Sequence, residues 1–261
     1  MDNGALLAIS PREGLDFAWT VGWTCFQTGR WEAHVERCIR QLLRPGDTAI
    51  DVGANLGYFS AVMAQCVEGH GRVWSFEPVP PTFERLCLSL SLNGFRHVTP
   101  LAVALGDAGG TARIVCDPCF AGSASFHGSS RGPHDESHQV PVHRLDDLLE
   151  ADPIGPVRLI KIDVEGHELA VMRGARQTIA QAKPSIVFEF SESLARSAGW
   201  TLPEIGQLLA ACADYHFYEI HNDGLRAIGD LSTYAAPPDA YGVDLLATCE
   251  VSALTPEPQG W

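Results

Sequence analysis

Two glycines and an acidic residue fall together in one short run, which reads Asp51-Val52-Gly53-Ala54-Asn55-Leu56-Gly57-Tyr58-Phe59. Glycines directly after a buried strand let the backbone approach a ligand closely, and the helix that follows offers free N–H groups. The spacing Gly53-x-x-x-Gly57 differs from the G-x-G-x-x-G pattern of dinucleotide sites. The carboxylate of Asp51 would repel a pyrophosphate but attract an ammonium or sulfonium group. The turn therefore favours S-adenosylmethionine over a nicotinamide dinucleotide.

A second acid, Glu77, follows the next predicted strand in the segment Ser75-Phe76-Glu77-Pro78. A carboxylate at this point can accept hydrogen bonds from both ribose hydroxyls of an adenosine. Together, Asp51 and Glu77 describe a ligand that combines an adenosine with a positive charge.

The elements that must position these residues alternate along the chain. Apolar strand-like runs are followed by amphipathic helix-like ones, which is typical of a mostly parallel sheet with helices on both faces. The predicted strands are 48–52, 72–76, 98–105, 158–164 and 185–190, and the predicted helices are 30–43, 56–67, 80–92, 167–182 and 203–213. Two further strands, 215–221 and 243–249, are expected to form an antiparallel edge pair.

One region breaks this alternation and marks the domain organisation. Residues 107–144 are rich in Gly, Ser, His and Pro, and we predict an inserted hairpin with a mobile tip that serves as a lid before the fourth strand. Residues 1–45 are predicted to form an N-terminal cover, 46–250 the cofactor-binding domain, and 251–261 a loose tail.

Several segments together resemble the FkbM-like family of class I S-adenosylmethionine-dependent methyltransferases. They are Gly46 to Phe59, Phe76-Glu77-Pro78, Ala104-Leu105-Gly106-Asp107, Arg144-Leu145-Asp146-Asp147-Leu148 and, most distinctive, Leu159-Ile160-Lys161-Ile162-Asp163-Val164-Glu165-Gly166-His167-Glu168. The resemblance implies a Rossmann-like sheet, a bound S-adenosylmethionine, and methylation of a hydroxyl on a sugar or a polyketide-like product. With these motifs, the predicted cofactor site comprises Asp51, Gly53, Asn55, Gly57, Tyr58, Phe59, Glu77, Pro78, Ala104 and Asp163.

Methyl transfer from a sulfonium is an in-line displacement, so the protein must bring the nucleophile and the methyl carbon together. A sugar hydroxyl is a weak nucleophile, and we expect a base or a metal ion to take up its proton. The predicted fourth strand ends near Asp163, at the edge where ligands bind in open α/β sheets. We therefore predict that Asp163 orients the cofactor or the acceptor, and that His167 or Glu165 is the general base.

These catalytic candidates have structural alternatives. Asp163 and Glu165 could instead accept hydrogen bonds from the free backbone N–H groups at the N-terminus of the helix predicted over 167–182, with His167 merely in its first turn. For Glu168 the structural role is the one we expect. His143, in a β-prone segment, is another candidate base, and its alternative is a histidine on a solvent-facing strand.

Asp163 and Glu189 indicate a second way to activate the hydroxyl. Both acids fall at the ends of neighbouring predicted strands, and carboxylate oxygens suit Mg²⁺. With another acid they could hold an ion that bridges two acceptor hydroxyls. Two carboxylates alone are few ligands, so the base and the metal mechanisms both stay open.

The charge balance bears on the partners. The chain has 18 Lys and Arg against 32 Asp and Glu, a formal net charge of -14. This charge disfavours nucleic acid and anionic membrane surfaces, and favours a small-molecule or oligosaccharide acceptor. No run approaches the roughly 20 apolar residues of a membrane helix, and the N-terminus lacks a secretory signal. We expect a cytoplasmic protein without membrane insertion; a homodimer is one of the assemblies left open.

The eight cysteines are too few for a disulfide scaffold. The close pair in Cys116-Asp117-Pro118-Cys119 lacks the further ligands of a zinc site, and we predict an ordinary loop. The usage of Ala, Gly and Arg hints at a high-GC bacterial source.

We therefore predict an S-adenosylmethionine-dependent O-methyltransferase that acts on a hydroxyl of a saccharide, as an oligosaccharide, a polysaccharide precursor or a glycosylated metabolite. Within the enzyme class, the alternative is a tailoring enzyme that methylates an oxygen or nitrogen of a polyketide or another secondary metabolite. Outside it, the alternative is a non-catalytic module that binds an adenosine nucleotide.

Overall fold

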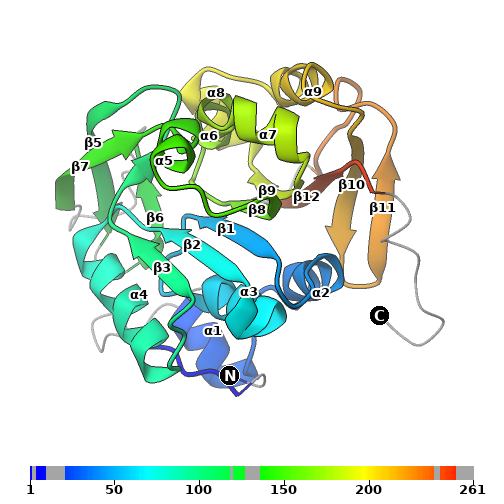
Figure 1. The fold of residues 1–261 in the computed structure, drawn as a ribbon. Coiled ribbons are helices and arrows are strands. Elements are labelled where there is room, and N and C mark those ends of the chain that lie inside the picture. Colours follow the sequence, from blue (N-terminus) through cyan, green and yellow to red (C-terminus); the bar gives the residue numbers. More distant parts are fainter. Residues whose placement is uncertain (2–3, 10–20, 118–119, 127–135, 238–241, 251–261) are drawn as a thin grey trace.

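A computed structural model describes residues 1, 4–9, 21–117, 120–126, 136–237 and 242–250 (Figure 1). Within these residues, the largest sheet has eight strands in the order β11-β10-β12-β9-β8-β1-β2-β3. The strands are β1 (Thr48–Val52), β2 (Arg72–Phe76), β3 (Val98–Leu101), β8 (Val157–Ile162), β9 (Ser185–Phe190), β10 (His216–His221), β11 (Gly224–Ile228) and β12 (Val243–Thr248).

The centre of this sheet is parallel, and one side of it is antiparallel. β1 pairs in parallel with β2 and with β8, and β8 pairs in parallel with β9. β12 runs antiparallel between β9 and β10. The register places Val52 opposite both Phe76 and Ile162. The carboxyl ends of the three central strands therefore meet at one edge.

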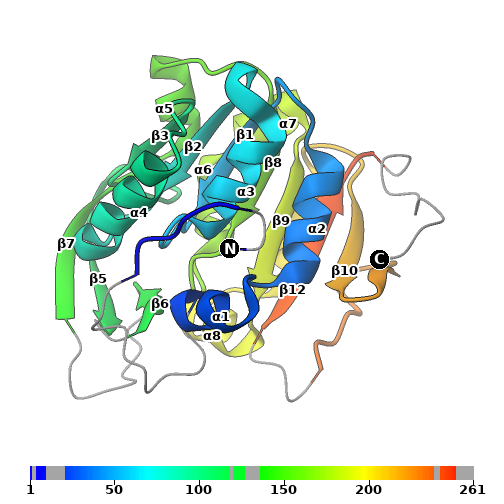
Figure 2. The same ribbon diagram turned by 90° about the horizontal axis from the view of Figure 1, so that it is seen from below.

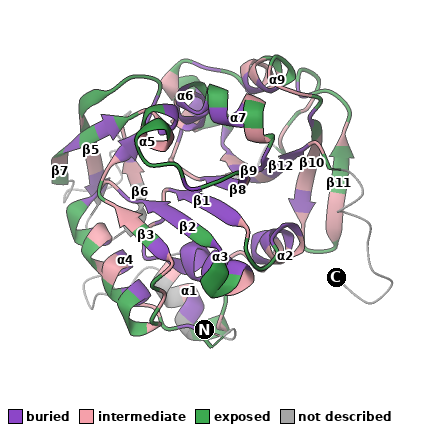
Figure 3. Cartoon of the chain, viewed as in Figure 1, coloured by how far each residue is buried: buried purple, intermediate pink, exposed green. Residues whose placement is uncertain are grey.

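Helices cover both faces of the sheet (Figures 1 and 2). On one face lie α2 (Ala33–Leu42), α3 (Tyr58–Val67) and α4 (Pro80–Leu92); on the other lie α5 (Leu145–Ala151), α6 (Glu168–Gly174), α7 (Arg176–Ala182), α8 (Glu192–Ala198) and α9 (Leu202–Ala210). The short helix α1 (Val21–Thr28) precedes α2, and a 3-10 turn (Glu68–His70) follows α3. Every residue of β1 is buried (Figure 3), as expected for a strand covered on both faces.

Four strands between residues 104 and 143 form a second sheet in place of a simple hairpin. Its order is β4-β7-β5-β6, with β4 (Ala104–Leu105), β5 (Gly110–Asp117), β6 (Phe120–Ser125) and β7 (Glu136–His143). It has its own small core, in which Ile114, Val140 and Val142 are buried. The strand predicted over 98–105 is therefore wrong in its second half, because β4 leaves the main sheet to pair with β7. The tip of the predicted lid, 127–135, lies outside the described residues.

The helix predicted over 167–182 is divided between α6 and α7. The carboxylate of Asp146 accepts hydrogen bonds from the backbone N–H groups of Gln177 and Thr178, both at 2.9 Å. These donors belong to the first turn of α7, where backbone N–H groups have no partner within the helix. A residue far away in the sequence thus stabilises a second helix start, which the periodicity of 167–182 does not reveal.

The antiparallel pairing of β10 with β12 confirms the predicted pair, but not its place at the edge. β12 is internal, and the edge strand is β11, which the sequence analysis missed along with α8. No helix among the described residues has the length and apolar character needed to cross a bilayer.

Candidate functional site

The segments that follow the central strands are tied together by backbone hydrogen bonds. The N–H groups of Gly53 and Ala54 donate to the carbonyl oxygen of Phe76 at 3.0 and 2.9 Å. The N–H of Asp163 donates to the carbonyl oxygen of Val52 at 3.0 Å. The structure thus brings the glycine-rich turn, the end of β2 and the start of the Asp163 segment to one place, as the sequence predicts.

The two glycines of the turn are needed for contacts within the protein. Gly53 has φ +81°, and a Cβ added there would lie 1.8 Å from the carbonyl oxygen of Asp163. Gly57 has φ +92°, and an added Cβ would lie 2.8 Å from Cδ1 of Leu86. Both positions combine a left-handed backbone with a close approach, so only glycine fits without strain. The glycines therefore serve the packing of the turn against β8 and α4, in addition to any approach to a ligand.

Asp51 is completely buried at the end of β1. Its Oδ2 accepts a hydrogen bond from the Ser60 hydroxyl at 2.6 Å, whereas its buried Oδ1 has no hydrogen-bond partner within the described residues. Burial raises the pKa of Asp51, against the opposing effects of Lys161 and Ser60. A buried acceptor without a partner is costly, and an ammonium group or a hydroxyl of a ligand would satisfy it.

Glu77 anchors the turn from the end of β2. Its Oε2 accepts the N–H of Asn55 at 3.0 Å, and its Oε1 accepts the N–H of Val79 at 2.9 Å. Each oxygen retains a free lone pair, as the capture of two ribose hydroxyls requires. Burial raises the pKa of Glu77 to about 7. Asn55 Oδ1 and Ser75 Oγ nearby are also buried without a partner in the described structure, so unsatisfied polar atoms gather where a cofactor is predicted.

The four other side chains of the predicted cofactor site are buried or half-buried. Tyr58 is buried in α3 and donates its hydroxyl to Glu36 Oε2 at 2.7 Å, which ties α3 to α2. Phe59 is buried beneath Lys161, whose Nζ lies 4.6 Å from the ring centroid. Pro78 is half-buried after Glu77, and Ala104 is buried at the start of the second sheet. A role of these side chains in cofactor binding stays a prediction.

Lys161 is a central residue that the sequence analysis did not single out. It is buried in β8, and its Nζ lies 3.0 Å from Asp163 Oδ2. Burial alone would lower the pKa of Lys161, but the carboxylates of Asp163, Asp51 and Glu32 outweigh it and raise the pKa. The sequence did contain a signal for this residue, since Lys161 is a single lysine inside an apolar strand. A buried ammonium requires a partner, so such a lysine indicates a nearby carboxylate.

A group of acids continues from Asp163 toward β12. Glu189 and Asp244 are register partners on β9 and β12. Burial and the carboxylates of Asp163, Glu165 and Asp244 raise the pKa of Glu189. The pKa of Glu32, at the N-terminus of α2, is raised by burial first and then by the carboxylates of Asp244 and Asp163. This edge of the sheet therefore carries more acidic than basic groups, and a cationic ligand would relieve the repulsion among them.

His34 joins this acidic group from α2. Its Nε2 lies 2.7 Å from Asp244 Oδ2, and both side chains are about one-fifth exposed. The two residues are far apart in the sequence, so no local motif could indicate the pair.

The predicted catalytic residues lie in different surroundings. Glu165 has a left-handed backbone with φ +50°, and its carbonyl oxygen accepts the Ser125 hydroxyl at 3.2 Å. The ring of His167 lies 4.7 Å from that of Phe126, centroid to centroid. His143 is exposed at the end of β7, whose buried side chains are Val140 and Val142. Of these three residues, Glu165 is the one whose negative charge acts on Glu189 of the acidic group.

Glu168 has the structural role that its sequence position suggests. Its Oε1 accepts the N–H groups of Val164 and Gly166, at 3.3 and 3.1 Å, and so holds the turn before α6. Burial raises the pKa of Glu168 to about 7. His167, the residue before α6, makes no capping hydrogen bond with its side chain, and the alternative in which Asp163 and Glu165 satisfy the start of this helix stays a prediction.

The metal hypothesis gains no further ligand. In the part of the chain that the structure describes, no three His, Cys, Asp or Glu side chains form a group that could hold a metal ion. The magnesium site at Asp163 and Glu189 stays a prediction with two candidate ligands. Cys116 is buried in β5, and Cys119 lies outside the described residues.

Comparisons with known proteins add to this geometry. A family model described as the methyltransferase FkbM domain matches residues 51–217. The crystal structure of methyltransferase FkbM from Methylobacillus flagellatus KT has a TM-score of 0.52 at 19% identity, and covers 81% of this chain and 50% of that one. A match at this identity shows the fold alone, and it confirms the predicted Rossmann-like class I sheet with helices on both faces.

Two curated relatives are similar in sequence. Hexuronic acid methyltransferase AglP of Haloferax volcanii is 28% identical over 158 residues, which are 60% of this chain and 62% of that protein. The 31-O-demethyl-FK506 methyltransferase FkbM of Streptomyces tacrolimicus is 28% identical over 162 residues, which are 51% of this chain and 60% of that protein. This chain thus spans less than two thirds of the length of either relative.

Proposed function

Because the chain belongs to the FkbM methyltransferase family, we propose that it is an S-adenosylmethionine-dependent methyltransferase and transfers the methyl group to a hydroxyl oxygen of a saccharide. The main support is the arrangement at the carboxyl ends of β1 and β2. There the fully buried Asp51 has one oxygen without a partner among the described residues, and the oxygens of Glu77 are already oriented by two backbone N–H groups. Such a pair suits the positive and the ribose ends of one ligand.

S-adenosylmethionine, when bound, supplies a methyl group that its sulfonium already activates. Glu77 would accept hydrogen bonds from the ribose hydroxyls. Asp51 and the acidic group around Asp163 would balance the positive charge of the donor. Asp51 and Asp163 both interact with the ammonium group of Lys161, and its positive charge limits the repulsion between the two carboxylates. The residues of the chain therefore hold and orient the donor, and the excess of acids at this edge favours the cationic donor over its neutral product.

The acceptor hydroxyl must lose a proton as its oxygen forms the bond to the methyl carbon and the carbon–sulfur bond breaks. We assign this proton to the carboxylate of Glu165, with Asp163 orienting the hydroxyl. Glu165 interacts electrostatically with Glu189 at the neighbouring strand, which suits a group beside the acceptor. His167 and His143 are the alternative bases, and Mg²⁺ held by Asp163 and Glu189 is the alternative means of lowering the pKa of the hydroxyl.

Methyl transfer is tested by incubating the purified protein with isotopically labelled S-adenosylmethionine and a panel of glycosides, macrolide aglycones and amines. We expect label on a glycoside hydroxyl and none on the other classes. Parallel reactions with added Mg²⁺ and with chelator decide whether a metal ion is required. Label on a macrolide would favour the polyketide alternative, to which the similarity to the FK506 enzyme points. Cofactor binding without transfer to any acceptor would favour the non-catalytic module.

Cofactor affinity should depend on pH through Glu77. Its raised pKa of about 7 means that the free protein holds a proton on this group below pH 7, whereas ribose hydroxyls donate most strongly to the ionised form. Affinity for S-adenosylhomocysteine should therefore rise about fivefold from pH 6 to pH 8, which corresponds to roughly 1 kcal/mol for a charge-assisted over a neutral hydrogen bond.

Calorimetric titration at several pH values measures this dependence. The Glu77→Gln variant, which cannot ionise, should bind more weakly at pH 8 and show a flat profile. A wild-type affinity that does not change with pH, or a variant with the wild-type profile, would contradict the assignment of Glu77 to the ribose.

A further inference from the structure

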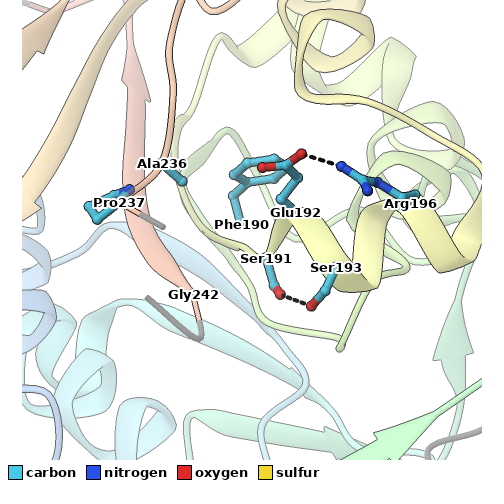
Figure 4. A pocket seen from close by; sticks show the side chains of 8 residues that line it. All are labelled: Phe190, Ser191, Glu192, Ser193, Arg196, Ala236, Pro237 and Gly242. Atoms are coloured by element: carbon cyan, nitrogen blue, oxygen red, sulfur yellow. Dashed lines mark hydrogen bonds and ion pairs between the residues drawn. The ribbon is translucent and has the colours of Figure 1, made fainter. Parts of the chain in front are cut away.

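A pocket of about 240 Å³ opens where β9 passes into α8 (Figure 4). One wall comes from the β9–α8 junction and carries Ser191, Ser193, Glu192 and Arg196. The opposite wall comes from the segment before β12, where Ala236 and Pro237 lie. None of these residues belongs to the predicted cofactor site.

The two walls differ in chemistry. On the first, Ser191 Oγ and Ser193 Oγ lie 3.0 Å apart, and Arg196 donates to Glu192 Oε1 at 2.5 Å. These groups offer both hydrogen-bond donors and acceptors. On the second wall, the described lining side chains before β12 are those of Ala236 and Pro237, which are apolar. A pocket with one polar and one apolar wall matches a sugar ring, which has hydroxyls at its rim and C–H groups on its face.

The pocket adjoins the acidic group of the methyl-transfer site. Its lining includes Phe190, the residue after Glu189 on β9, and Gly242, which precedes β12. A Cβ added at Gly242 would lie 2.4 Å from Glu189 Oε1. The carboxyl of Glu189 is therefore in contact with the rim of the pocket, so a molecule bound there would have one end at the acids around Asp163.

Size and charge narrow the class of occupant. The volume lies below the roughly 300 Å³ at which pockets for drug-sized ligands begin, which suits a single ring and not a macrocycle. The one cation of the pocket, Arg196, is paired with Glu192. On the Glu189 side, burial and the negative charges of Asp163, Glu165 and Asp244 raise the pKa of Glu189, and the same charges would repel an anionic ligand.

We propose that this pocket is the acceptor subsite and takes one uncharged, hydroxyl-bearing sugar ring, whose reacting hydroxyl lies beside Glu189. The subsite rests on the proposed methyl transfer for its role, but its ligand can be tested by binding alone. The segment 236–237 supplies the face of the ring with apolar contacts, and the two serines bind its hydroxyls. An acceptor that carries a carboxylate on this ring is disfavoured.

The test uses the full chain loaded with S-adenosylhomocysteine and saturation-transfer NMR. The probes are neutral methyl pyranosides of glucose, galactose, mannose and rhamnose, compared with the glucuronoside and the galacturonoside. We expect at least one neutral glycoside to bind more tightly than either uronoside. Ala236→Trp, which fills the pocket, should weaken this binding by at least about tenfold through steric exclusion, and Ser193→Ala should weaken it severalfold.

Two matched variants serve as controls. Ala235→Trp places the same indole one residue outside the pocket, and Ser197→Ala removes a hydroxyl one turn further along α8. Both should bind the glycosides like the wild type, and all four variants should keep the wild-type affinity for S-adenosylhomocysteine. Equal glycoside binding by the Ala236→Trp variant and the wild type, tighter binding of a uronoside, or no binding of any glycoside would overturn the subsite.

The labelled methyl-transfer assay separates this inference from the proposed function. A glycoside that binds in the pocket but is never methylated would leave the subsite standing and remove the saccharide methyltransferase. Methyl transfer to any acceptor that proceeds at the wild-type rate in the Ala236→Trp variant would retain the enzyme and remove the subsite.

Discussion

Replacing Asp51 with Asn should lower the affinity for S-adenosylmethionine by at least about thirtyfold, since truncating one partner of a buried hydrogen-bonded charge pair costs roughly 2–5 kcal/mol. The carboxylate is fully buried, and its Oδ1 has no partner within the described residues. A neutral amide would keep the acceptor for Ser60 but lose the attraction to a positive charge. Calorimetric titration of the variant measures the loss directly.

The same substitution should leave the protein folded. Burial raises the pKa of Asp51, so the ionised carboxylate is less favourable in the folded chain than in the unfolded chain. Its contribution therefore destabilises the fold increasingly as the pH rises above the ordinary carboxyl range. Asn removes this cost, and the melting temperature at pH 7 should stay within a few degrees of the wild type.

Asp47→Asn provides the control for the loss of one negative charge. Asp47 precedes β1 at the opposite edge of the sheet, and its Oδ2 accepts the N–H of Arg44 at 2.7 Å, which an amide oxygen can also do. We expect its affinity for S-adenosylmethionine to stay within about twofold of the wild type, as a distant exposed charge is screened. Equal losses in both variants, or none at Asp51, would show that Asp51 does not contact the cofactor.

Of the substitutions predicted here, Lys161→Met should cause the largest loss of folding stability. Lys161 is buried with its Nζ 3.0 Å from Asp163 Oδ2, and it also interacts with Asp51 and Glu32. Removal of one partner of a buried ion pair costs about 3–5 kcal/mol, because it leaves an uncompensated charge. For a domain of this size, we expect the melting temperature to fall by on the order of 10 °C.

Calorimetric unfolding of three variants tests this role. Lys183→Met, at an exposed position after α7, should melt like the wild type. The double variant Lys161→Met/Asp163→Asn should recover part of the stability that Lys161→Met loses, because the charge left without a partner is also removed. Destabilisation that the second substitution does not relieve would indicate lost packing against Phe59 and not an uncompensated carboxylate.

Most of the cofactor half of the site could be predicted from the sequence because its chemistry is local. The boundaries of β1, β2, α4 and β9 are those expected from the pattern of apolar residues. The turn from Asp51 to Gly57 joins a strand directly to a helix, so its conformation follows from a few consecutive residues. The position of Glu77 follows from parallel pairing, which brings the ends of adjacent strands together.

The proposed acceptor half of the site was much less predictable, because its parts come from distant segments. His34 reaches Asp244 across 210 residues of sequence, and the pocket joins the start of α8 to the segment before β12. Neither α8 nor β11 was expected. The second sheet was expected only as a hairpin. Whether β4 continues the main sheet or pairs with β7 depends on contacts between strands, and the composition of a single strand does not reveal it.

The sequence by itself determined the family, the strand–turn–helix that we propose binds the donor, and the acids that accompany it, because periodicity and residue type act over short distances. Tertiary structure alone decided how these residues are used. It made Gly53 obligatory through contact with Asp163, placed Lys161 among three carboxylates, and built a pocket beside Glu189 from two separate segments. Buried charges and close backbone contacts depend on what packs around them, and only the folded chain supplies that.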